Sequence, residues 1–225
     1  MINDLIAISW LSACFLGLFG VSELIHRTTS VKVEHTRKFV HFGTGVLTLL
    51  FPVFLSSSWS VLFLCASFAV ILLLSLKYQF LPSINAIDRK SHGSILYPVA
   101  VYSCFLLYEY HHSDLMFFYA PVLVLAISDP MAALFGKRWP KGEFTIGNDS
   151  KTVMGCSAFF GSALVILAVL GFLFYGSGFF TFEQLYLLIL VSLGATLVEA
   201  VSGKGSDNLT IPLSVVLLLS LFASL

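Results

Sequence analysis

The residues best suited to chemistry lie between Ile127 and Gly155, where an apolar run passes into a polar loop and then returns to apolar sequence. Asp129 falls inside the first run, about two helical turns before it ends at Gly136. An ionisable side chain within a membrane span costs about 2.5–3.5 kcal/mol and commonly marks a functional site. The loop is cationic, with Lys137, Arg138, Lys141 and Lys151. A carboxylate facing such a loop is suited to a magnesium-bound phosphate ester.

A second acidic set lies near the C-terminal end. Glu199 sits late in an apolar run, and Gly203 and Gly205 follow it, before the polar stretch SDNLTIP at residues 206–212. The glycines predict the end of a helix. The Asp207–Asn208 pair would either cap the next helix or bind a metal or a base, and the spacing alone leaves both interpretations open.

Two further cationic stretches precede apolar runs. Arg37, Lys38 and His41 are spaced so that Arg37 and His41 share one face of a helix entering the membrane. This pair could hold a phosphate or a lipid headgroup, or form only a basic patch against anionic lipid. Residues 88–94 combine Arg89 with glycine and hydroxyl groups, shortly before Tyr97.

The composition defines the environment of these residues. Hydrophobic residues make up 58% of the 225-residue chain and charged residues 11%, with a mean hydropathy of +0.94. A soluble protein carries about 25% charged residues, so we expect an integral multi-pass membrane protein. The four cysteines stand singly in apolar runs and are interpreted as small buried hydrophobes. The N-terminal sequence MIND lacks the basic region of a signal peptide, so the first apolar run should remain as a span.

The apolar runs predict an all-α bundle of about eight transmembrane helices in a single domain over residues 1–225, with seven or nine helices as alternatives. Each run approaches the roughly 20 residues that cross a bilayer. The runs cover residues 5–26, 39–56, 59–76, 94–110, 116–136, 153–174, 184–202 and 209–224. All twelve Lys and Arg fall in the odd-numbered connections. The positive-inside rule therefore places these connections in the cytoplasm and both termini outside.

The acids within the runs fit one site that opens to the cytoplasm. Asp129 and Glu199 lie near the cytoplasmic ends of their predicted helices, beside the basic connections. Lys151 and Thr152 precede the sixth helix, whose N-terminal N–H groups favour anions. Asp149 with Ser150 would alternatively serve only as a cap for that helix.

These motifs, in this order, resemble the polyprenol kinase family, which includes dolichol, phytol and farnesol kinases and related CTP-dependent diacylglycerol kinases. The resemblance rests on R-K-x-x-H at 37–41, G-S-x-x-Y-P at 93–98, D-x-x-A-x-x-x-G at 129–136, S-K-T at 150–152 with a glycine at 155, and Glu199 with D-N-L-T-I-P at 207–212. It covers nearly the whole chain. The last motif, combined with that at Asp129, is the most specific.

The resemblance implies transfer of the γ-phosphate of CTP to a lipid hydroxyl, with magnesium, at the cytoplasmic face of the membrane, which would be the cell membrane in a prokaryote. It implies catalytic roles for Asp129, Lys151 and Glu199, with Asp129, Glu199 and Asp207 around the metal and His41 and Tyr97 near the lipid. The residues expected to bind the nucleotide and its phosphates are Arg37, Lys38, Arg89, Lys137, Ser150, Thr152 and Asn208. We expect no nucleic-acid partner. Self-association, the alcohol, the general base, and CTP against ATP remain open.

One residue departs from the family pattern, and two other functions compete. Relatives usually have a glutamate where this chain has Met154, so Glu199 or Glu143 would have to substitute if that glutamate holds metal. Phosphatidate cytidylyltransferase shares the Asp129 and S-x-K-T elements, but its C-terminal H-G-G-x-x-D-R-x-D pattern is missing here. A transporter with ion-coupling carboxylates is the more distant alternative.

Overall fold

The computed structural model describes residues 2–85, 93–146, 149–203 and 205–223, and this part of the chain is mostly helical. The helices of the first half are α1 (Ile2–Thr28), α2 (Val33–Thr48), α3 (Phe51–Phe54), α4 (Ser58–Tyr78), α5 (Pro82–Asn85) and α6 (Gly93–Tyr110). The second half holds α7 (Met116–Leu123), the π-helix η1 (Val124–Ser128), α8 (Asp129–Arg138), β1 (Glu143–Ile146), β2 (Asp149–Thr152), α9 (Val153–Tyr175), the 3₁₀-helix η2 (Ser177–Phe179), α10 (Phe182–Val201) and α11 (Asp207–Ala223).

The all-α expectation is confirmed, while eight spans stay a prediction. Within the described residues, five helices are long and apolar enough to cross a membrane. They are Asn3–Thr28, Ser58–Tyr78, Met116–Arg138, Val153–Tyr175 and Phe182–Val201, and Asp207–Leu221 forms a shorter apolar helix. Several apolar spans and large exposed hydrophobic side chains, such as Trp59 and Phe182, are what a lipid-facing surface requires. The chain is therefore a multi-pass membrane protein.

The second apolar run differs from its predicted form. The sequence predicts one helix over residues 39–56, whereas α2 begins at Val33 and ends at Thr48, and the short α3 follows. Pro52 explains the break, because it has no N–H to donate to the Thr48 carbonyl. The early start of α2 brings the polar residues before position 39 onto a helix.

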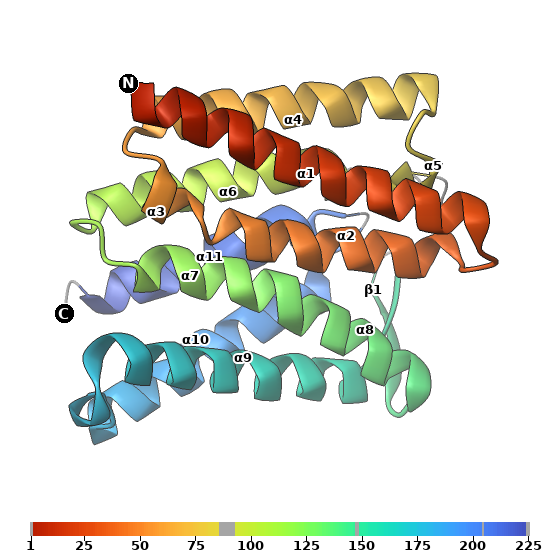
Figure 1. Cartoon of the computed structure of the whole chain (residues 1–225). Coiled ribbons are helices and arrows are strands. Elements are labelled where there is room, and N and C mark those ends of the chain that lie inside the picture. Colours follow the sequence, from red (N-terminus) through yellow and green to blue (C-terminus); the bar gives the residue numbers. More distant parts are fainter. Residues whose placement is uncertain (1, 86–92, 147–148, 204, 224–225) are drawn as a thin grey trace.

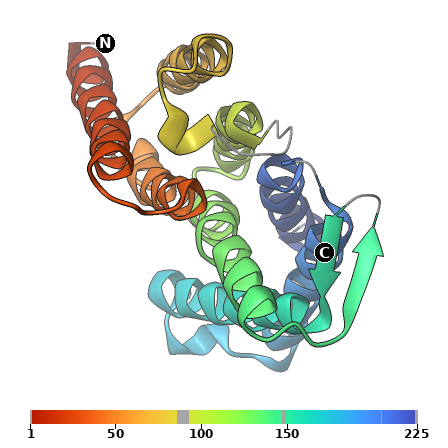
Figure 2. The ribbon, with the colours of Figure 1, turned by 90° about the vertical axis from the view of Figure 1, so that its right-hand side faces the viewer.

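The helices form a bundle in which both termini lie at one end and the β-strands lie at the other (Figure 1). Packing pairs α1 with α2, α4 with α6, and α8 with α9, while α11 contacts both α6 and α10. Figure 2, which looks along the bundle from the hairpin end, shows α5 between the ends of α1, α4 and α6. The side chains of Phe105, Phe118 and Phe159 are fully buried inside the bundle.

The polar loop after residue 136 is more ordered than the sequence predicts. Lys137 and Arg138 belong to the last turn of α8, and β1 and β2 pair antiparallel, with Glu143 opposite Thr152 and Ile146 opposite Asp149. Lys151 therefore lies on a strand that leads into α9. The hairpin ties the cationic segment to the start of that helix.

Candidate active site

The predicted site residues surround one polar cavity of about 940 Å³ at the hairpin end of the bundle. Its walls come from α2, α8, β1, β2, the first turn of α9, the end of α10 and the start of α11. The predicted residues that line it are Arg37, Lys38, His41, Asp129, Lys137, Ser150, Lys151, Thr152, Glu199, Asp207 and Asn208. Arg89 lies outside the described residues, and Tyr97 lines a neighbouring cavity instead.

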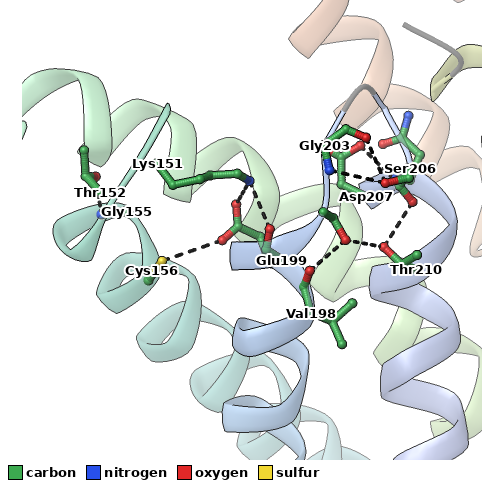
Figure 3. A network of polar contacts seen from close by, with 12 residues as sticks. Lys151, Thr152, Gly155, Cys156, Val198, Glu199, Gly203, Ser206, Asp207 and Thr210 are labelled. Carbon is green, nitrogen blue, oxygen red and sulfur yellow. Dashed lines mark hydrogen bonds and ion pairs between the residues drawn. The ribbon is translucent and has the colours of Figure 1, made fainter. Parts of the chain in front are cut away.

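Lys151 and Glu199 form the central ion pair of this cavity. The Lys151 ammonium contacts the Glu199 carboxylate and also donates to the Glu199 backbone carbonyl, at 3.0 Å (Figure 3). Both side chains are largely withdrawn from solvent, Glu199 almost completely. The Cys156 thiol approaches the second Glu199 oxygen at 3.9 Å. Lys151 thus holds its buried partner in place and also brings a cation to the cavity wall.

Asp129 begins α8 immediately after the π-helix η1. Its carboxylate lines the cavity, and within the described residues it forms no hydrogen bond or ion pair. Asp207 and Glu199 repel it, whereas Lys151 and Lys38 attract it. π-Helices are rare in proteins, and those that occur are frequently found at functional sites. The wider turn places Asp129 where α2, α10 and α11 converge.

His41 stabilises this π-helix. Its Nε2 lies 3.1 Å from the Leu125 carbonyl oxygen, which accepts a hydrogen bond, so Nε2 carries the proton. In a π-turn the Leu125 carbonyl would accept from the N–H of residue 130, and that residue is proline. The histidine replaces the missing donor. His41 therefore couples α2 to the segment that carries Asp129.

Glycines bring α8 and α9 into close contact. A Cβ added at Gly155 would lie 2.9 Å from the Ala132 carbonyl oxygen, and one at Gly136 would lie 2.8 Å from the Thr152 hydroxyl. Thr152 is the N-cap of α9 and accepts from the Gly155 N–H at 2.9 Å. The interpretation of Asp149 and Ser150 as the cap is therefore wrong. Gly136 and Gly155 allow α8 and α9 to cross closely, and this crossing fixes the position of Lys151 relative to Asp129.

The connection before α11 is held by its own polar side chains. Ser202 and Thr210 share a hydrogen bond of 2.7 Å, and Ser206 donates to the Gly203 carbonyl at 2.8 Å (Figure 3). The Asn208 amide donates to the Gly93 carbonyl at 2.8 Å, which ties α11 to the start of α6. The Asp207 carboxylate accepts from the Asn208 N–H at 2.9 Å and also lines the cavity.

A second, narrower cavity of about 90 Å³ adjoins the polar one. Arg37, His41 and Asn208 line both cavities. The remaining walls are mostly apolar and come from α1 to α6. Tyr97 is part of this wall, and its buried hydroxyl has no hydrogen-bond partner among the described residues. The two lipid-binding candidates, His41 and Tyr97, are therefore placed at the junction and in the apolar wall.

Metal binding at this site would require oxygen atoms from a bound substrate in addition to the protein side chains. Within the described residues, no three His, Cys, Asp or Glu side chains converge closely enough to hold an ion. Magnesium is commonly bound by one or two carboxylates together with substrate phosphates. Asp129 and Asp207 both line the cavity, while Glu199 is paired with Lys151. The donor set suits magnesium that arrives with a nucleotide.

Sequence reasoning missed several residues of the cavity. Glu34 contacts Lys137 across the gap between α2 and α8. Cys156 was interpreted as a buried hydrophobe, but it is half-buried beside Glu199. Glu143, named as a substitute for the glutamate absent at Met154, lines the cavity. No local spacing indicated either contact, because Cys156 meets Glu199 43 positions away and Glu34 meets Lys137 103 positions away.

The bundle and its polar cavity define a membrane-embedded enzyme in which buried acids face a cationic loop. The chain is 30% identical over 205 residues to a phytol kinase from Synechocystis sp. (strain PCC 6803), which covers 90% of this chain and 86% of the relative. The chain therefore belongs to the polyprenol kinase family and is a prenol-type lipid kinase that phosphorylates an alcohol. No family model matches the chain, and no solved structure matches it.

Proposed function

We propose that this protein transfers the γ-phosphate of CTP, with magnesium, to the hydroxyl of a membrane isoprenoid alcohol at the cytoplasmic face of the membrane. The observation that carries the proposal is the junction of the two cavities. A polar cavity lined by acids and cations shares Arg37, His41 and Asn208 with an apolar cavity between helices. A charged nucleotide and a lipid alcohol could therefore meet there without either leaving its own environment.

The proposed roles follow the charges on the cavity walls. Arg37, Lys38, Lys137 and Lys151 would bind phosphate oxygens, together with the N-terminus of α9, which Ser150 and Thr152 precede. Asp129 and Asp207 would hold magnesium that arrives with the nucleotide, and Glu199 would join them if it left its pair with Lys151. When bound, that ion would neutralise charge that develops on the transferred group. Asn208 would contact the base or complete the metal shell.

Phosphoryl transfer depends mainly on positioning the reactants and on neutralising the charge of the phosphates. In this proposal the packed helices do the first and the cations of the cavity wall contribute to the second. The glycine crossing of α8 and α9 and the His41 contact with Leu125 fix the elements that carry Asp129 and Lys151. Tyr97 and His41 would guide the acceptor hydroxyl towards the junction. The alcohol would enter laterally from the bilayer, with its chain between the helices.

The decisive experiment uses purified protein in lipid nanodiscs with farnesol, phytol, a longer polyprenol, diacylglycerol and phosphatidate as separate acceptors. Parallel reactions contain CTP labelled at the α- or the γ-phosphate, with γ-labelled ATP as the donor control. We expect γ-label from CTP, and no α-label, to enter the lipid. Transfer of α-label with phosphatidate would instead establish cytidylyl transfer, and equal use of ATP would refute the donor assignment.

A further inference from the structure

The shape of the apolar cavity carries information about the acceptor. Its lining residues on α4 run from Leu72 to Leu64, which corresponds to about 12 Å along the helix. Those on α2 run from Arg37 to Thr48, about 16 Å. The cavity therefore starts at the polar junction and reaches roughly half-way through a hydrocarbon layer of about 30 Å.

Aromatic rings occupy the deep end of this cavity. Phe51, on α3, is the lining residue farthest along α2 and α3 from Arg37, and only 2% of it is exposed. Phe15 of α1 packs edge-on against it, with ring centroids 6.0 Å apart, and against Phe68 of α4 at 5.0 Å. Three helices thus contribute rings to one wall, which would stop a guest that enters from the junction.

The width of the cavity separates two classes of lipid. Its volume of about 90 Å³ is small beside the 940 Å³ of the polar cavity, and residues of α1 to α6 and α11 surround it. A chain of three isoprene units occupies more than 90 Å³, so even a single chain enters only when the lining side chains move apart. Two acyl chains leaving one glycerol would require the surrounding helices to separate.

We infer that this cavity holds one isoprenoid tail and that Phe15 and Phe51 limit the length of tail that the protein encloses. An extended chain advances about 1.25 Å per carbon, so three isoprene units span about 14 Å and four about 19 Å. The enclosed length of about 12–16 Å therefore corresponds to about three isoprene units. The inference rests on the proposed function only in assigning that tail to the acceptor alcohol.

Binding and transfer are measured separately to test this inference. A photoreactive farnesol analogue is bound to the protein in detergent and displaced by geraniol, farnesol, geranylgeraniol, a longer polyprenol and diacylglycerol, and γ-label transfer from CTP is recorded in parallel. Burial of added methylenes strengthens binding. We expect at least tenfold tighter binding of farnesol than geraniol, and less than a threefold further gain beyond three units. Diacylglycerol should not compete.

Two variants change the deep end in opposite directions. Phe51→Ala opens it and should favour the four- and five-unit alcohols over farnesol by at least fivefold. Val101→Phe places a ring in the wall of the cavity and should weaken farnesol and longer alcohols while geraniol is retained. The matched control is Phe54→Ala, which removes a ring from the same short helix where it is 46% exposed and packs against Trp10. Its length profile should equal that of the parent.

The outcomes distinguish this inference from the proposed function. Prenols that bind with the expected length profile but receive no phosphate would refute the proposed activity and leave the tail site standing. Phosphate transfer with an unchanged length profile in both variants would refute the role of Phe51 and this wall. Absence of prenol binding, or competition by diacylglycerol equal to that of farnesol, would overturn the single-chain assignment.

Discussion

At the scale of single residues, Asp129 is distinguished by what it lacks. The acids Glu23, Glu34 and Glu199 each contact a cation, whereas Asp129 forms no hydrogen bond or ion pair within the described residues. A carboxylate in this position has its full capacity to accept a ligand. Burying it beside two other carboxylates would be unfavourable unless a cation were bound during function.

Replacing Asp129 with Asn tests this interpretation, because the two side chains have nearly the same shape. We expect Asp129→Asn to lower phosphate transfer by at least 100-fold, the loss typical of removing one transition-state electrostatic contact. Insertion into the membrane should be unchanged. Transfer is measured with γ-labelled CTP, and Glu109→Gln, an exposed carboxylate at the other end of α6, is the control. Activity retained in Asp129→Asn would remove the residue from the mechanism.

The Lys151–Glu199 pair permits a test that separates stability from chemistry. Removing one member of a buried pair costs about 3–5 kcal/mol, because the other charge is left uncompensated. Lys151→Met alone should therefore lower the apparent Tm in detergent by several degrees. The double variant Lys151→Met with Glu199→Gln should recover most of that stability and remain inactive. Recovery of transfer in the double variant would show that the pair is only structural.

At the scale of elements, the crossing of α8 and α9 controls the separation of Asp129 and Lys151. Gly155→Ala would place a methyl group against the Ala132 carbonyl, and backbone cannot move aside as a flexible side chain does. We expect the crossing to widen and kcat to fall at least tenfold. Gly161→Ala, two turns further along α9, meets no atom within 4 Å and should be neutral or slightly stabilising. Equal effects of the two variants on kcat would contradict this account.

The contact between Glu34 and Lys137 links α2 to α8 across the polar cavity. The hydrogen bond from Lys137 holds the pKa of Glu34 below its ordinary value, with Lys38 adding to the effect. A lowered pKa stabilises the contact above the ordinary pKa of glutamate, and this stabilisation is lost as the pH falls through the lowered one. The contact should therefore be intact at neutral pH.

Nucleotide kinetics distinguish a phosphate ligand from a helix clamp at Lys137. If Lys137 binds phosphate, Lys137→Ala should raise KM for CTP severalfold with little change in kcat. Glu34→Gln, which releases the ammonium, should leave KM unchanged or lower it. A merely structural contact would instead make both variants equally less stable, which thermal unfolding would detect.

The comparison of sequence and structure shows which elements a local pattern determines. The apolar runs correspond to helices because a hydrophobic segment of membrane length satisfies its backbone only by forming one. The π-helix before Asp129 and the hairpin carrying Lys151 were not predicted. The first depends on a contact between His41 and Leu125, 84 residues apart, and the second is a short pairing within a polar segment.

The candidate site illustrates the same limit. Its residue types and their place at one end of the bundle followed from charges in apolar sequence, and the cavity contains all of them that are described apart from Tyr97. The pairing of Lys151 with Glu199 joins residues 48 positions apart and depends on how α9 packs against α10. No local spacing encodes that distance.

At the scale of the whole molecule, the charge distribution and the fold together predict the orientation of the protein in the membrane. The cations of the described residues lie in helix ends, the hairpin and connections at the end of the bundle that holds the hairpin, opposite both termini (Figure 1). The positive-inside rule then predicts that the polar cavity faces the cytoplasm, where nucleotides are available. The proposal that CTP is the phosphate donor therefore requires the cavity to face the cytoplasm.

This orientation predicts opposite accessibility for the two ends. Trypsin added to right-side-out vesicles should leave the segment between α8 and β1 intact, and trypsin added to inverted vesicles should cleave it at Lys141, which is exposed. Reporter domains fused to either terminus should show the reverse pattern, because both termini would face away from the cytoplasm. Cleavage at Lys141 from the outside would place the cavity away from the nucleotide pool. That result would exclude cytosolic CTP as the donor even if the lipid kinase chemistry were retained.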